Sequence, residues 1–219
     1  DSNVVTPAPS CVPGPIETSS ITNIDTVDGS WNGAGASEGV PMTVTWQSIA
    51  YGDGRFVAGG QDISSGTNLI MYSTDNAETW TPVSVQPGYW RGMTYGNGRW
   101  VATSAGSNSS RVMYSDNGGE TWTADNVTSK GWQSVATDGN GTFVAVGNVD
   151  NSSEGAIMYS TGNAGVGTWT EVSGSEITAG KWHAVTYGDG LFVVVGEGTV
   201  NRVMYSSDGI SWSAVGTSN

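Results

Sequence analysis

The chain has few of the side chains on which catalysis usually depends. His183 is the only histidine and Cys11 the only cysteine, so a metal site built from several histidines or thiolates is excluded. Cys11 lies between Pro9 and Pro13 in a linker-like segment, and we assign it no catalytic role. Carboxylates are plentiful, so a pair of them placed for glycoside hydrolysis is the enzymatic alternative that the composition leaves open.

The remaining candidates are hydrogen-bonding and aromatic side chains in polar connecting segments. Such groups suit the hydroxyls of a sugar, and they suit plain solvation equally well. Carboxylate oxygens also suit Ca²⁺, but no segment has the spacing of an EF-hand loop, so we expect no cofactor and keep Ca²⁺ as a lesser alternative. The candidate ligand-binding residues are Asp62, Tyr89, Asn108, Asp150, Asn151, Glu154, Glu176 and Glu197.

The charge balance excludes several classes of partner. The 219 residues include seven Lys and Arg against twenty Asp and Glu, a formal charge of −13. So acidic a chain repels the phosphates of nucleic acids and anionic membrane surfaces. No apolar stretch is long enough for membrane insertion. Ten tryptophans beside 33 glycines indicate a folded, turn-rich protein rather than a low-complexity chain.

An internal repeat determines how these residues must be positioned. Each of four copies begins with a Trp, continues through a Gly-rich turn into an apolar segment, and then contains Met-Tyr-Ser and a second Trp. The first tryptophans are Trp46, Trp90, Trp132 and Trp182. A period of 42 to 50 residues, obtained from these positions, is in the range of propeller blades.

Strand and turn signals alternate within each copy. In the first copy they predict strands over 45–51, 55–60, 68–73 and 79–85, with no helical periodicity in any segment. Apolar runs such as 143–146 indicate middle strands that are buried on both faces. We therefore predict an all-β fold, a β-propeller of four four-stranded antiparallel blades, with a β-solenoid or an open stack of sheets as the alternative.

The predicted organisation has two parts. Residues 1–40 form a Pro-, Ser- and Gly-rich N-terminal arm or linker, and 41–219 form the four-repeat propeller, with blades at about 45–88, 89–130, 131–180 and 181–215. The arm is either a flexible leader or a docking segment in which Trp31 is the anchor. Residues 42–45 are candidates for pairing near the last blade to close the ring.

The corner between the third and fourth strands resembles the Asp-box, the bacterial neuraminidase repeat Ser-x-Asp-x-Gly-x-Thr-Trp. The first two copies read Ser73-Thr-Asp75-Asn-Ala-Glu-Thr-Trp80 and Ser115-Asp-Asn117-Gly-Gly-Glu-Thr-Trp122. The resemblance covers 45–215 and implies a propeller. It also implies that the box residues are structural, with the carboxylate or amide accepting bonds from its own turn. These residues are Asp75, Trp80, Asn117, Trp122, Asn163, Trp169, Asp208 and Trp212.

The resemblance to sialidases, which share this box, raises the question of enzymatic activity. It would imply six blades and three arginines converging on the substrate carboxylate. Here the chain has four copies, and Arg55 and Arg99 occupy one repeat position while Arg111 and Arg202 share another. Arginines that recur with the repeat are expected in the scaffold or facing solvent. We therefore predict a protein that is not an enzyme, with no catalytic residue and no metal site.

Propeller topology separates the connections into two sets. The turns after the first and third strands are short and nearly uniform, whereas the other connections differ in length and sequence between copies. Repeats that keep one rim constant and vary the other usually bind through the variable rim. The candidate ligand-binding residues belong to this variable set.

These observations, with a likeness to repeats of phage tail and virion-surface proteins, lead to a ranked expectation of function. The first is a non-enzymatic structural or receptor-facing module of a phage virion or tail, located on the virion or at a cell surface. Its partners would be other virion or surface proteins, held through the N-terminal arm, and cell-surface glycans. The second is a secreted bacterial lectin-like adhesion module, and the third a sialidase-type glycosidase.

Overall fold

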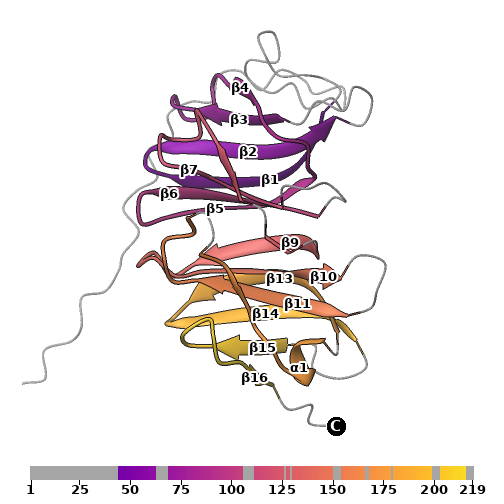
Figure 1. Cartoon of the computed structure of the whole chain (residues 1–219). Coiled ribbons are helices and arrows are strands. Elements are labelled where there is room, and N and C mark those ends of the chain that lie inside the picture. The colour runs from indigo at the N-terminus through magenta and orange to yellow at the C-terminus, as the bar shows by residue number, and fades with distance from the viewer. Residues whose placement is uncertain are drawn as a thin grey trace, which may run out of the picture. The chain divides into compact units, whose positions relative to one another are not determined.

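A computed structural model describes most of the repeat region (Figure 1). The described residues are 44–62, 69–105, 111–125, 127–128, 130–149, 154–165, 168–178, 180–198 and 203–215. The predicted N-terminal arm and its Trp31 lie outside these residues. The only helix among them is α1 (Ser175–Thr178), four residues long, and none of the described residues forms a helix that would cross a membrane.

The described strands form four four-stranded antiparallel sheets, as the repeat predicts. Within every sheet the strands pair in sequence order. Sheet A contains β1 (Val44–Gly52), β2 (Arg55–Asp62), β3 (Leu69–Ser73) and β4 (Thr81–Ser84). Sheet B contains β5 (Trp90–Gly96), β6 (Arg99–Ser104), β7 (Val112–Ser115) and β8 (Thr123–Asp125).

The other two sheets repeat this arrangement. Sheet C contains β9 (Lys130–Thr137), β10 (Phe143–Val149), β11 (Gly155–Ser160) and β12 (Thr170–Glu171). Sheet D contains β13 (Gly180–Gly188), β14 (Leu191–Gly198), β15 (Val203–Ser206) and β16 (Ser213–Ala214).

The hairpin between the first two strands depends on the local sequence. Asp53-Gly54, Asn97-Gly98 and Asp189-Gly190 all have positive φ at both residues. That is the backbone of a type I′ turn, which matches the twist of the flanking strands and favours Asp-Gly and Asn-Gly pairs. The turn chemistry in the sequence therefore sets the register of these three sheets.

Apolar side chains fill the space between consecutive sheets. The first strands of the sheets pack in series, β1 on β5, β5 on β9 and β9 on β13. Each junction has its own core, which combines side chains of one sheet with a Trp from the first strand of the next: Trp90, Trp132 and Trp182. The middle strands β6 and β10 are buried along nearly their whole length, which confirms the prediction of strands covered on both faces.

Two expectations need correction. Val44 and Thr45 pair with Asp62 and Gln61 of β2, in their own sheet, and not near the last blade. The short helix α1 was not expected, and it has a packing role, because Ile177 is buried in the core between sheets C and D.

Among the described strands, no pair from sheets A and D packs as the successive first strands do. Figure 1 shows the outer strands of these two sheets at opposite ends of the stack.

Candidate functional site

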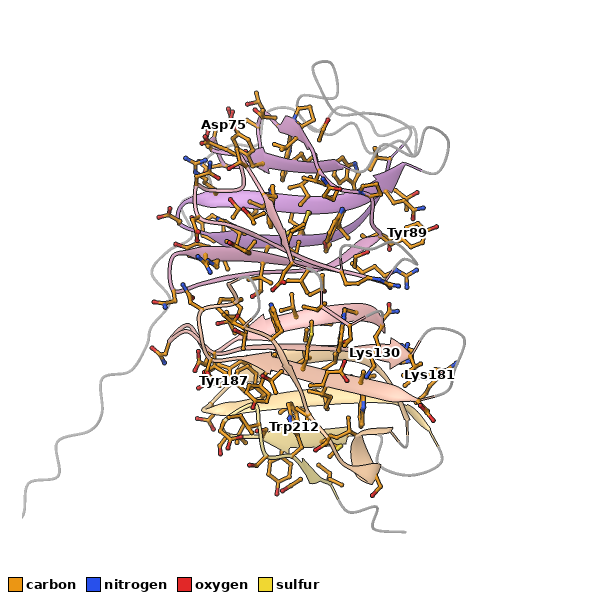
Figure 2. The ribbon with its side chains drawn as sticks, viewed as in Figure 1. Asp75, Tyr89, Lys130, Lys181, Tyr187 and Trp212 are labelled. Atoms are coloured by element: carbon orange, nitrogen blue, oxygen red, sulfur yellow. The ribbon has the colours of Figure 1, made fainter. Side chains whose placement is uncertain are left out.

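The two edges of the sheet stack carry different kinds of residue. Antiparallel pairing places the hairpin turns and the box-like corners at one edge and the variable connections at the other. Figure 2 shows Asp75 and Tyr187 on one side and Tyr89, Lys130 and Lys181 on the other. We call these edges the corner edge and the variable edge.

At the corner edge, the box-like carboxylates are occupied by their own turns. Asp75 accepts hydrogen bonds from the backbone N–H of Thr79 at 2.9 Å, the Thr79 hydroxyl at 2.5 Å and the Ser73 hydroxyl at 2.8 Å. These bonds, the Thr79 hydroxyl first, lower the pKa of Asp75 to about 2. Asp208 accepts from the backbone N–H groups of Ser211 and Ile210, which likewise lower its pKa. Both carboxylates therefore act as turn acceptors.

Sheets B and C show two further versions of this corner. Asn117 accepts from Thr121 N–H at 3.0 Å, so its amide replaces the carboxylate. In sheet C, Gly162 is two residues after Ser160, at the position of the carboxylate, and the Thr168 hydroxyl lies 2.6 Å from that of Ser160. Asn163, which the sequence suggested as the box residue, instead accepts from the Asn97 side chain of sheet B at 3.3 Å. Counted from the Ser of the corner, Asn163 and Ala164 match Asn76 and Ala77, whose backbones also have positive φ, so the copy differs in having Gly162 where sheet A has Asp75.

Two arginines of the corner edge connect neighbouring sheets. Arg99 binds both carboxylate oxygens of Asp116 at 2.6 and 2.8 Å, and its third nitrogen donates to the carbonyl of Asn163 in sheet C at 2.7 Å. Its guanidinium also lies over the Tyr114 ring, 4.3 Å from the centroid. Arg55 reaches Glu120 of sheet B at 2.9 Å. Both side chains therefore belong to the scaffold and do not converge on a common point.

At the variable edge, every first strand contains a β-bulge immediately after its tryptophan. In β1 the pairing passes from Trp46 to Ser48 and leaves Gln47 without a partner on β2. The same irregularity leaves Arg91, Gln133 and His183 unpaired on their neighbouring strands. Bulges re-aim a side chain out of the regular pleat and are common next to functional sites. We call these four residues, Gln47, Arg91, Gln133 and His183, the bulge row.

The bulge row forms a polar surface that crosses sheet boundaries. Arg91 Nη1 donates to Gln133 Oε1 at 2.8 Å, which joins sheets B and C at this level. The side chains of Gln47, Arg91 and His183 are exposed and that of Gln133 is half-buried. A guanidinium, amides and an imidazole in one row can donate several hydrogen bonds to a polar ligand.

Basic side chains lie around this row, and the lysines among them are each close to a glutamate. Lys130 is the first residue of β9, two residues before Trp132. Lys181 is the second residue of β13, one residue before Trp182. Lys130 Nζ contacts Glu171 at 2.5 Å, and the Thr128 hydroxyl also donates to Glu171. Burial raises the pKa of Glu171, but the bonds from Lys130 and Thr128 outweigh burial and lower this pKa overall. Lys181 and His183 both face Glu197, at 3.7 and 3.8 Å. Three of the seven Lys and Arg and the only His are thus on three neighbouring strands.

The predicted ligand-binding residues are only partly brought together. Tyr89 is 38% exposed and lies two residues before Arg91, and Glu197 faces Lys181 and His183. Glu154 is exposed at the start of β11, where its carbonyl accepts from Val149. The side chains of Asp62 and Glu176 lie outside the described part of the molecule, as do Asn108, Asp150 and Asn151 entirely.

Sequence reasoning missed the bulge row because a bulge depends on pairing between strands. One signal was present: the position after the first Trp holds Gln, Arg, Gln and His, whereas its neighbours are nearly constant. Among the described residues, no three His, Cys, Asp or Glu side chains are grouped so as to hold a metal ion. The Ca²⁺ alternative stays a prediction.

No protein-family model matches the chain, and no curated protein matches it in sequence. Solved structures do resemble it. "YCF48 bound to D1 peptide" aligns with a TM-score of 0.57 and 14% identity over 79% of this chain and 53% of that one. "Crystal structure of Nidogen/Laminin Complex" aligns with a TM-score of 0.57 and 14% identity over 76% of this chain and 62% of the other.

The computationally designed Ika4 protein aligns with a TM-score of 0.53 and 13% identity, over 82% of this chain and 95% of that design. This chain spans 53% of the length of the YCF48 structure and 62% of the length of the chain in the nidogen/laminin complex. The structural neighbours are β-propellers, and together with the four four-stranded sheets they confirm the predicted fold class. At these identities the likeness extends to the fold alone.

Proposed function

We propose that the chain is a non-enzymatic recognition module that binds a carboxylate-bearing glycan at the variable edge. The observation that carries this proposal is the bulge row, in which Arg91, Gln133 and His183 extend from neighbouring strands with Lys181 beside them. A guanidinium binds a carboxylate through two parallel hydrogen bonds, and amides bind hydroxyls. The exposed ring of Tyr89 supplies an apolar surface for the C–H face of a sugar.

The use of the corner-edge residues supports a non-enzymatic role. Asp75 and Asp208 are ionised turn acceptors, and Arg55 and Arg99 join sheets. These two carboxylates and two arginines are therefore bound within the scaffold, which supports the proposal of a module without hydrolase activity. A module without enzymatic activity could be displayed on a phage virion or act in bacterial adhesion. The likeness of the repeats to those of phage tail and virion-surface proteins favours the virion.

The names of the two natural neighbours, one with a bound peptide and one in a laminin complex, support binding as the general role. A protein ligand is therefore the main outcome against which glycan binding must be tested. The glycan is preferred because the bulge row combines cationic and amide groups with an exposed aromatic ring.

The test is binding of the 219-residue chain to an array of sialylated, uronate-containing and neutral glycans. We expect saturable binding to the acidic members. Arg91→Gln should weaken it by about 10- to 100-fold, the value of a hydrogen bond to a charged group. Arg55→Gln is the matched control, since it removes the same charge at the opposite edge and should leave binding unchanged once folding is verified by circular dichroism.

Four results would contradict the proposal. Equal binding of acidic and neutral glycans, or none to either, would remove the proposed ligand class, and capture of a peptide at the bulge row would replace it with a protein. Turnover of a fluorogenic sialoside would show that the module is an enzyme.

A further inference from the structure

Within the described part of the chain, no sheet packs on the outer side of the first strand of sheet A. Ile49 and Tyr51 are each 61% exposed, and Trp46 is only half-buried. The residues equivalent to Ile49 in the other sheets are buried against the preceding sheet: Met93, Val135 and Val185, at 8%, 6% and 8% exposure. The residues equivalent to Trp46 are fully buried: Trp90, Trp132 and Trp182. The surface formed by Trp46, Ile49, Tyr51 and the nearby Ala77 is called the free face of sheet A.

Sheet D likewise has no described sheet packed on its opposite face. Val195 is 43% and Tyr205 is 41% exposed, and Val193 and Val203 are half-buried. In the preceding sheets the residues equivalent to Val193 are completely buried under the next sheet: Val57, Val101 and Val144. Val193, Val195, Val203 and Tyr205 form the free face of sheet D.

The two free faces are the two halves of one type of junction. At the junction of sheets A and B, a Cβ on Gly119 would lie 3.1 Å from the Val57 methyl group. At the junction of sheets C and D, a Cβ on Gly209 would lie 2.7 Å from a Val144 methyl group. Ala77 of sheet A is at the repeat position of Gly119 and Gly209, and Val193 of sheet D is at the position of Val57 and Val144. Each free face therefore carries one residue of this contacting pair.

The free face of sheet D differs from the A–B and B–C junctions in a way that suits apolar contact. The position of Arg55 and Arg99, which reach the corner of the next sheet, is occupied in sheet D by Leu191, whereas sheet C already has the uncharged Thr142 at this position. A junction formed by sheet D would therefore replace a charged link with a half-buried leucine, and its stability would come from burial of apolar surface.

The occupant that fits these faces is a second copy of the chain. The two faces do not pack on each other among the described strands, and residues 1–43 contain no copy of the repeat. Two copies would place eight sheets in one ring, inside the usual range of about four to eight blades. Contacts between two different faces close into a ring when the rotation between copies allows it.

We propose that sheet D of one copy packs on sheet A of a second copy in the register of the internal junctions, so that two copies complete one propeller. The two free faces together are thus an interface for self-association.

Light scattering after size exclusion tests the association directly. We expect the full chain to have twice its mass of 22.6 kDa. Ile49→Glu and Val195→Glu each introduce a charge on one free face, at side chains exposed within a single copy, and each should give a folded monomer by circular dichroism. Ile210→Glu changes a residue of similar exposure outside both faces and should remain dimeric.

A mixture distinguishes this arrangement from one that joins two identical faces. The Ile49→Glu copy keeps an intact sheet D and the Val195→Glu copy an intact sheet A, so an equimolar mixture should recover a dimer through one undamaged junction. A monomeric wild-type chain would overturn the proposal. So would a dimer that only one of the two variants disrupts, since that would indicate contact between identical faces.

Cross-linking covers the case in which the charged variants fail to fold. With Cys11→Ser in both chains, Ala77→Cys in one and Val193→Cys in the other should form a disulfide between copies, visible on a non-reducing gel. Ala77→Cys with Ile210→Cys is the matched pair that should not cross-link. Equal cross-linking of both pairs would show random collision and overturn the assigned register.

Discussion

At the scale of single residues, the same turn is completed by different groups. Asp75 and Asp208 use a carboxylate, Asn117 uses an amide, and Gly162 leaves the role to the Thr168 hydroxyl. What the turn requires is an acceptor or a linking hydroxyl near the Ser, and the net charge is secondary. The four corners therefore keep a similar turn although their sequences differ from one another and from the full Asp-box pattern that they resemble.

The lowered pKa of Asp75 predicts a pH-dependent contribution to stability. A carboxylate whose pKa falls from 3.8 to about 2 on folding stabilises the fold above pH 3.8, and this contribution is lost as the pH falls toward 2. Asp75→Asn keeps an acceptor for Thr79 but cannot titrate. The melting-temperature difference between wild type and variant should therefore shrink over this range, and a constant difference would contradict the assignment.

Arg99 predicts a structural effect that is separable from recognition. Arg99→Leu copies the residue that sheet D has at this position, and it removes the bonds to Asp116 and to the Asn163 carbonyl. We expect a loss of about 1–3 kcal/mol in the free energy of unfolding, because hydrogen bonds to a charged group are removed at a partly buried site. Urea denaturation measures this, and glycan binding per folded molecule should not change.

At the scale of elements, each sheet is stabilised mainly by the side chains that enter its neighbour. The strands, hairpins and sheet order could be predicted because the repeat, the apolar runs and the Asp-Gly pairs are local signals. The bulges and the cross-sheet bond of Asn163 could not, because the bulges depend on register between strands and the bond depends on how two sheets pack. The helix α1 was missed because four residues are too few to show helical periodicity.

The first and the second Trp of each repeat copy are expected to contribute differently to the free energy of unfolding. Trp132 is fully buried between sheets B and C, and Trp132→Ala should cost about 3–5 kcal/mol. Trp122 at the corner edge is half-buried, and Trp122→Ala should cost less, although it also loses the bond to the Gly119 carbonyl. Urea denaturation of both variants measures this, and equal costs would show that the second Trp carries as much packing as the first.

At the scale of the whole molecule, the few basic side chains are unevenly distributed over an acidic protein. The chain has a formal charge of −13, yet Arg91, Lys130, Lys181 and His183 lie on neighbouring first strands at the variable edge. Of the candidate ligand-binding residues named from the sequence, Tyr89 and Glu197 lie near the bulge row, and binding at this edge stays a prediction. The residues of the bulge row itself emerged only from the structure.

This charge distribution predicts a salt dependence of binding. Attraction between an acidic glycan and exposed cations at the bulge row is screened as ionic strength rises, with a Debye length of about 10 Å at 0.1 M. The dissociation constant should therefore increase with added NaCl in the wild type and increase less in Arg91→Gln. Isothermal titration over a salt series measures both slopes, and parallel slopes would contradict a role for Arg91.

Hydrogen–deuterium exchange with and without bound acidic glycan tests the central assignment most directly, because it reports both edges in one experiment. The account predicts added protection around 89–91, 131–133 and 181–183, where the bulge row and its neighbours lie, and none at the hairpin turns 52–54, 96–98 and 188–190. Protection confined to those turns would contradict it and place recognition at the corner edge.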